Sequence, residues 1–109
     1  MPKTINRDEL NRRIFHGDAP VVLEALPEKY FIDGHLPGAK HMPHDEVKER
    51  AAKLAPDKEA SIVVYCASDA CQNSHQAAAA LEALGYTDVA VYPGGKQDWL
   101  QAGLELETS

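Results

Sequence analysis

The feature that most constrains the fold of this chain is a short apolar strand that leads through a polar loop into a helix. Residues 61–66 (SIVVYC) are mostly β-branched or aromatic, and the run is long enough for a strand but too short for a helix. Residues 77–84 are rich in alanine and leucine, with apolar side chains at helical spacing. The sequence therefore predicts a buried strand, a tight loop and a helix in direct succession.

Cys66 ends the predicted strand and stands at the mouth of the loop of residues 67–72. The first N–H groups of the following helix have no partner within that helix and point into the loop. These donors and the helix dipole favour negative charge, and a thiolate is negative. We therefore expect the pKa of Cys66 to be lowered and this residue to be a nucleophile, although a small buried apolar side chain is the alternative.

Predicted strands alternate with predicted helices along the chain. Turn residues are dense at residues 30–39, where no regular element is predicted. Alternating strands and helices predict an α/β fold, with a mostly parallel central sheet and helices on both faces, in a single domain of residues 1–109. Ligands of such sheets bind beyond the carboxyl ends of the strands, where Cys66 lies. Strands are predicted at residues 21–23, 39–42, 61–66 and 89–92, and helices at residues 7–16, 45–54, 77–84 and around Trp99.

The first predicted helix has a clear start and a clear end. Asn6 is placed as its N-cap residue, with an acidic residue three positions later. Leu10, Ile14 and Phe15 are expected to form its buried face. Gly17 follows the last helical residue and is expected to end the helix in the left-handed conformation common there.

Composition narrows the classes of partner. The 109 residues carry a formal net charge of −6, which disfavours binding to nucleic acid or to an anionic membrane. No apolar segment is long enough to span a membrane, and residues 1–4 do not open a signal peptide. Two cysteines are too few for a disulfide scaffold, so the cytoplasm is the expected compartment. No cofactor is expected.

Three short motifs occur in order along the chain: residues 34–39 (GHLPGA), residues 63–66 (VVYC), and residues 94–95 (GG) followed by Trp99. Each motif alone is weak, but all three in register over one domain length are fairly specific. They resemble a single domain of the rhodanese (sulfurtransferase) family, and the resemblance covers nearly the whole chain. The family fold agrees with the α/β prediction.

The resemblance implies a function for Cys66. This residue would accept a sulfane sulfur as a persulfide and pass it to a thiol or to cyanide. The donor would be a small-molecule or protein persulfide, and backbone N–H groups of the loop would surround the sulfur. The implied substrate-binding loop consists of Ala67, Ser68, Asp69, Ala70, Cys71 and Gln72.

The chain departs from the family pattern at two places. Family members carry Asp-Val-Arg at the end of the second strand, where this chain has residues 23–25 (LEA); Glu24 is either a buried partner or exposed. The family loop carries arginines, whereas here Ala67 follows Cys66 and Asp69 stands in place of a cation. Asp69 should raise the pKa of Cys66. We therefore expect weak binding of thiosulfate, a dianion, and better use of a persulfide donor.

The loop also resembles that of the dual-specificity phosphatases built on this fold, because it is about two residues longer than the commonest sulfurtransferase loop. Their loop reads Cys-x5-Arg, and Gln72 occupies the arginine position. Phosphoryl transfer needs a cation there, because charge stabilisation is most of the catalysis. Phosphatase activity is therefore not expected.

Cys71 has two interpretations. It is either a loop thiol without a role or a resolving thiol that attacks a persulfide or sulfenate on Cys66 and closes a disulfide. A loop that cradles the sulfur directs its rim side chains outward, so disulfide formation would require the loop to rearrange. Cys66, Cys71 and His75 also form a weak zinc pattern without a fourth ligand, and no metal site is expected. His75 is expected to be neutral and solvated.

The leading prediction is therefore a sulfurtransferase or persulfide carrier that uses Cys66. Two alternatives stay open: a non-catalytic binding or sensing module with the rhodanese fold, and a thiol redox switch that uses Cys66 and Cys71. His35 is expected to hold a turn through backbone bonds, and Trp99 to be part of the core. The sequence leaves the oligomeric state open.

Overall fold

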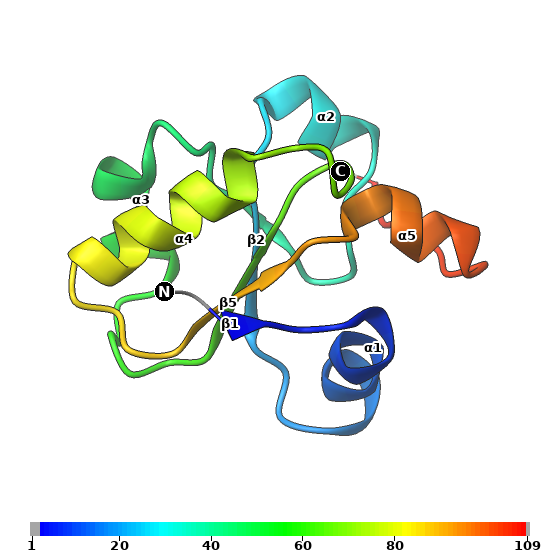
Figure 1. Cartoon of the computed structure of the whole chain (residues 1–109), viewed down its shortest axis with the longest axis horizontal. Coiled ribbons are helices and arrows are strands. Elements are labelled where there is room, and N and C mark those ends of the chain that lie inside the picture. Colours follow the sequence, from blue (N-terminus) through cyan, green and yellow to red (C-terminus); the bar gives the residue numbers. More distant parts are fainter. Residues whose placement is uncertain (1–2, 109) are drawn as a thin grey trace.

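The computed structural model describes residues 3–108, and within this range five strands form one parallel sheet, in the order β1-β5-β4-β2-β3 (Figure 1). Strands and helices alternate, which confirms the α/β prediction. Met1 and Pro2, which bear on the prediction about a signal peptide, lie outside the described residues. Among residues 3–108, no helix is both long and apolar enough to cross a membrane.

The strands are β1 (Lys3–Thr4), β2 (Val21–Glu24), β3 (Lys40–His41), β4 (Ile62–Tyr65) and β5 (Val89–Tyr92). The helices are α1 (Arg7–His16), α2 (Glu28–Asp33), α3 (Val47–Leu54), α4 (Asn73–Ala83) and α5 (Gly95–Gln101).

The central strand β4 is buried on both faces, as its β-branched sequence predicts. Its side chains alternate between two cores, because successive residues of a strand point to opposite faces. Ile62 and Val64 pack with residues of α3 and α4 on one face. Val63 and Tyr65 pack with residues of α1 and α5 on the other face. Figure 1 shows these two helix pairs on opposite sides of the sheet, as expected.

Helix α1 begins as predicted, but its buried face is narrower than expected. The Asn6 side chain accepts a hydrogen bond from the backbone N–H of Glu9 at 2.8 Å, which confirms the cap. Leu10 is fully buried, whereas Phe15 is 56% exposed. The prediction for Phe15 was wrong because five residues along a helix carry a side chain well past the face that Leu10 occupies. Gly17 ends the helix with φ −153°, an extended conformation rather than the predicted left-handed one.

Two short elements lie outside the sequence prediction. Helix α2 begins directly after Pro27, in the turn-rich stretch before the GHLPGA motif, and none of its residues is buried. Without a buried face it has no hydrophobic periodicity by which a sequence could reveal it. Strand β1 has two exposed residues and pairs only with β5, at the edge of the sheet.

Candidate active site

Cys66 directly follows β4, at the carboxyl edge of the parallel sheet, and is 1% exposed. Its thiol lies 3.5 Å from the hydroxyl oxygen of Ser74, a buried residue in the first turn of α4. The carbonyl oxygens of Cys71 and Ser68 lie 3.4 Å and 3.9 Å from the sulfur. The predicted strand, loop and helix therefore meet around this sulfur.

The groups that face the sulfur differ from those that the resemblance implies. The carbonyl oxygens of Ser68 and Cys71 face Cys66, and the backbone N–H of Ser74 acts on the same sulfur. A carbonyl oxygen accepts a hydrogen bond from a thiol and repels a thiolate. The loop conformation in this structure therefore fits the neutral, protonated form of Cys66.

The pKa of Cys66 is raised, chiefly by burial and secondly by the Cys71 thiol beside it. The hydroxyl and backbone N–H of Ser74 act in the opposite direction and lower this pKa. The first turn of α4 therefore lowers the pKa of Cys66 through Ser74, as expected. Burial raises this pKa by more, so the prediction of a lowered pKa was wrong. Asp69, which was expected to raise the pKa, is exposed on the loop.

This shift predicts a loss of stability at alkaline pH. A thiol whose pKa is higher in the folded state stabilises the fold fully below its unfolded pKa, about 8.5, and progressively less as the pH rises through the folded value. We expect the free energy of unfolding to fall between about pH 8.5 and 9.5, below the range in which tyrosines titrate. Urea unfolding with reductant present, on Cys71→Ser and on the Cys66→Ser, Cys71→Ser double variant, measures the effect. Parallel pH curves for the two would contradict it.

The start of α5 holds the backbone of the loop. The N–H of Lys96 donates to the carbonyl oxygen of Cys66 at 3.1 Å, and the N–H of Gln97 donates to that of Ala67 at 2.8 Å. This close approach requires glycine at position 95, where φ is +62° and a Cβ atom would lie 2.2 Å from the Cys66 oxygen. The glycine pair of the third motif therefore positions the cysteine loop.

A buried ionic network lies beside this contact. Glu24 is fully buried, and its Oε1 accepts a hydrogen bond from the Tyr65 hydroxyl at 2.7 Å and pairs with Lys96 Nζ at 3.0 Å. The Tyr65 oxygen in turn accepts from the N–H of Leu36, in the GHLPGA motif, at 3.0 Å. Burial and the Glu24 carboxylate raise the pKa of Tyr65. Of the two alternatives for Glu24, buried partner or exposed side chain, the structure therefore shows the first: Glu24 is buried and pairs with Tyr65 and Lys96.

Sequence reasoning missed Lys96, whose side chain is only 13% exposed. The residue follows the glycine pair directly, and that position is the only sequence signal that pointed to it. The ammonium group of Lys96 is paired with Glu24 and also donates to the Tyr30 carbonyl oxygen at 2.6 Å. Its positive charge is therefore compensated within the protein and does not stabilise an anionic substrate. Lys96 therefore does not replace the missing arginines of the loop.

The remaining predicted site residues differ in exposure. Cys71 is half-buried, its carbonyl oxygen faces the Cys66 sulfur, and its thiol contributes to the raised pKa of Cys66. His75 is exposed in the first turn of α4, as predicted. Among residues 3–108, no three or more His, Cys, Asp or Glu side chains are grouped to hold a metal ion, so the zinc pattern is not assembled. The exposed loop residues are Ala67, Asp69, Ala70 and Gln72, and Ser68 is partly buried.

His35 and Trp99 have the structural roles that were predicted. His35 Nδ1 lies 3.0 Å from the carbonyl oxygen of Phe31, and the two rings stack with centroids 4.0 Å apart. Trp99 is buried and donates its indole N–H to the carbonyl oxygen of Glu105 at 3.0 Å. Both residues hold loops in place.

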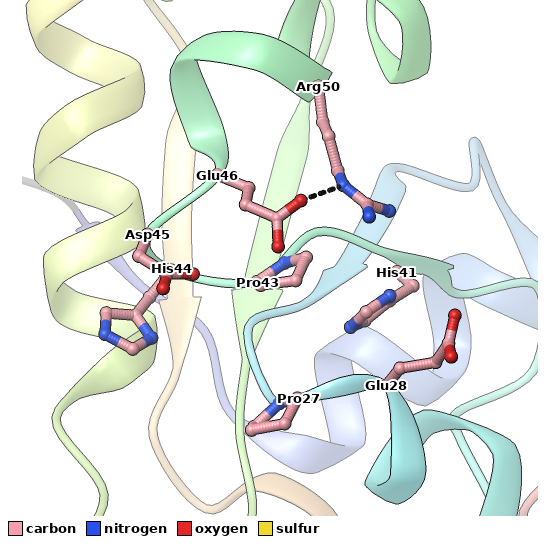
Figure 2. A pocket seen from close by; sticks show the side chains of 8 residues that line it. All are labelled: Pro27, Glu28, His41, Pro43, His44, Asp45, Glu46 and Arg50. Atoms are coloured by element: carbon pink, nitrogen blue, oxygen red, sulfur yellow. Dashed lines mark hydrogen bonds and ion pairs between the residues drawn. The ribbon is translucent and has the colours of Figure 1, made fainter.

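A pocket of about 380 Å³ lies on the same edge of the sheet, beyond the ends of β2 and β3 (Figure 2). Its lining is about as apolar as it is polar, and Figure 2 shows Arg50 paired with Glu46 on one wall, with an N–O distance of 2.9 Å. Cys66 does not line it, because β2 separates β4 from β3, and two strand spacings are about 10 Å. The lining residues are Pro27, Glu28, His41, Pro43, His44, Asp45, Glu46 and Arg50.

The fold and the position of Cys66 define a class of protein. Residues 6–102 match the rhodanese-like domain family, and the chain belongs to that family.

Two curated proteins and many solved structures are similar to it. Thiosulfate sulfurtransferase PspE of Escherichia coli (strain K12) is 44% identical over 64 residues, which are 59% of this chain and 59% of that protein. The HTH-type transcriptional regulator Rv0324 of Mycobacterium tuberculosis is 32% identical over 103 residues, 94% of this chain but 44% of the regulator. A crystal structure of a Pseudomonas aeruginosa thiosulfate sulfurtransferase superposes with a TM-score of 0.86 at 27% identity, over 98% of this chain and 20% of that one. The chain thus spans less than two thirds of the length of each of these three.

Proposed function

We propose that this protein is a sulfurtransferase or persulfide carrier that uses Cys66. The Cys66 thiolate attacks the sulfane sulfur of a donor, the donor's S–S bond breaks, and the donor leaves as a thiolate. Cys66 then carries a persulfide. An acceptor thiol or cyanide attacks the outer sulfur, and Cys66 leaves as a thiolate.

One observation supports this proposal most: Cys66 lies at the carboxyl end of the central strand, with Ser74 of the following helix 3.5 Å from its sulfur. The Ser74 hydroxyl and N–H favour the thiolate that the reaction needs. Membership of the rhodanese-like family, and similarity to a protein named thiosulfate sulfurtransferase, support the reaction class. Location in the cytoplasm stays a prediction.

A persulfide suits this site better than thiosulfate as the sulfur donor. The sulfur faces two carbonyl oxygens, the loop carries Asp69, and the nearby Lys96 is paired with Glu24. These groups give a dianion little stabilisation, and the net charge of −6 adds none. At its sulfur end, a persulfide brings at most one negative charge to the site, whereas thiosulfate brings two.

Turnover tests the proposal directly. Wild-type protein with glutathione persulfide as donor and cyanide as acceptor should form thiocyanate faster than the heat-denatured protein. Cys66→Ser should reduce the rate to that of the denatured control, because the covalent carrier is lost. A Cys66→Ser rate equal to the wild-type rate would overturn the role of Cys66.

An arginine introduced at position 67 should improve the use of thiosulfate. Ala67 is exposed, and only its backbone oxygen is held by α5, so a longer side chain can reach solvent and substrate. We expect kcat/KM for thiosulfate to rise about tenfold, because a charge-assisted hydrogen bond contributes about 1.5–3 kcal/mol. The gain should be larger at low ionic strength, where screening is weak. Ala67→Gln is the neutral control, and saturation of the unmodified protein by micromolar thiosulfate would contradict the electrostatic explanation.

A non-catalytic binding or sensing module is the second candidate function. The observation that favours it is the match of 94% of this chain to part of a transcriptional regulator, together with a loop that has no arginine. Such a module would bind a ligand through the same fold without turnover. Thiocyanate formation no faster than that of denatured protein, with both glutathione persulfide and thiosulfate, would favour it over the enzyme.

A further inference from the structure

The residue that carries the second thiol of the loop lies against the first thiol. The carbonyl oxygen of Cys71 is 3.4 Å from the Cys66 sulfur, and the Cys71 thiol contributes to the raised pKa of Cys66. Both thiols are free in this structure. Cys66 is almost completely buried, whereas Cys71 is half-buried and reaches the surface. An acceptor from solvent therefore meets Cys71 before it meets Cys66.

We infer that Cys71 resolves the persulfide of Cys66 within the same chain, releasing hydrosulfide and leaving a Cys66–Cys71 disulfide. This inference rests on the proposed function, because it needs a persulfide on Cys66. The Cys71 sulfur attacks Cys66 Sγ, a new S–S bond forms, and the bond between Sγ and the sulfane sulfur breaks. The proton of Cys71 leaves with the hydrosulfide. The sulfane sulfur is reduced and the two cysteine sulfurs are oxidised, so the step needs no other oxidant.

Attack on the inner sulfur is favoured over attack on the outer one. Attack on the outer sulfur would expel the Cys66 thiolate, which is a poorer leaving group than hydrosulfide because burial raises the pKa of Cys66. Attack on the inner sulfur expels hydrosulfide, the anion of a stronger acid than an ordinary thiol. Because a more acidic leaving group departs faster, the disulfide and free hydrosulfide are the expected products.

The loop can accommodate the bond without disturbing the core. Cys71 already folds back, since its N–H donates to the Ser68 carbonyl oxygen at 3.1 Å. It precedes α4, which begins at Asn73, so the helix need not unwind. Ala67, Asp69 and Ala70 are exposed, and a small movement of the loop exposes no apolar surface. A disulfide needs Cα atoms within about 7 Å, a range that such a movement can supply.

A dithiol must reopen the disulfide for a further turnover. Without an external acceptor, the protein would convert persulfide to hydrosulfide repeatedly when a dithiol reductant is present, and would stop after one sulfur when it is absent. An acceptor such as cyanide would compete with Cys71 for the persulfide of Cys66. Where no acceptor competes, the second thiol would thus decide the fate of the sulfur: release as hydrosulfide with Cys71 present, and a retained persulfide without it.

Loading with glutathione persulfide, without acceptor or reductant, tests this inference. After desalting, wild-type protein should have released about one hydrosulfide per chain, and its intact mass should show the loss of two hydrogens. Cys71→Ser should instead keep the mass of one added sulfur and release only background hydrosulfide. Gln101→Ala, at an exposed position at the end of α5 and outside the loop, keeps both thiols and should behave like wild type. Thermal unfolding shows that each variant is folded, and Cys71→Ala is the substitute if Cys71→Ser is not.

Two failures are distinguishable. If Cys71→Ser holds a persulfide and wild-type protein holds it equally well, without hydrosulfide release, Cys71 is not a resolving thiol and the proposed function stands. If no folded Cys71 variant gains sulfur, the proposed function and this inference are both overturned.

Discussion

Replacing Gly95 with alanine should destabilise the protein strongly and abolish sulfur transfer. The new Cβ atom would lie 2.2 Å from the Cys66 carbonyl oxygen, closer than any real contact, and the backbone at φ +62° disfavours a side chain. We expect a loss of about 3 kcal/mol, from about 1–2 kcal/mol for the left-handed conformation and about 1–3 kcal/mol for overpacking. Urea unfolding and thiocyanate formation measure the two effects.

Gly103→Ala is the matched control for this substitution. Gly103 also has a positive φ, +80°, but a Cβ atom there would meet nothing within 4 Å. This variant should lose only the conformational contribution, about 1–2 kcal/mol, and keep its activity. Equal losses of stability and activity in both variants would show that contact between Gly95 and the cysteine loop is unimportant.

Removal of the buried cation should be the second large effect. Lys96→Met would leave the Glu24 carboxylate fully buried without its ion-pair partner. Breaking a buried pair at one partner costs about 3–5 kcal/mol, because the remaining charge is uncompensated. Chemical denaturation of Lys96→Met measures this loss directly.

Two comparisons separate the buried charge from other causes. The Glu24→Gln, Lys96→Met double variant removes both charges and should recover much of the lost stability. Arg50→Met removes the cation of a surface pair with Glu46 and should change stability by less than about 1 kcal/mol. A loss in the double variant as large as in Lys96→Met would contradict the role of an uncompensated charge.

The fold could be predicted largely because its main elements carry their own signals. Residues 62–65 are β-branched or aromatic and buried on both faces, and the alanine-rich helix after them packs as its periodicity indicated. Helix α2 could not be predicted, since it has only six residues, none of them is fully buried, and its three apolar residues are consecutive rather than at helical spacing. Phe15 was misplaced because a residue five positions after the buried Leu10 lies on another part of the helix surface.

The candidate site could be predicted in its position but not in its electrostatics. Cys66 and the helix behind it follow from the order of strand, loop and helix. The sign of the pKa shift depends on whether C=O or N–H groups face the sulfur and on how deeply it is buried, and neither follows from residue types alone. The pair of Glu24 and Lys96 joins residues 72 positions apart in sequence, which no local pattern indicates.

The central claim is that Cys66 carries the sulfane sulfur, and the most direct test is the mass of single-cysteine variants after exposure to glutathione persulfide. Cys71→Ser, which keeps Cys66, should gain the mass of one sulfur atom, and cyanide should remove it. Cys66→Ser, which keeps Cys71, should gain none, because the proposed mechanism places the persulfide on Cys66, the residue that ends the central strand. A sulfur atom gained by Cys66→Ser and not by Cys71→Ser would contradict the claim.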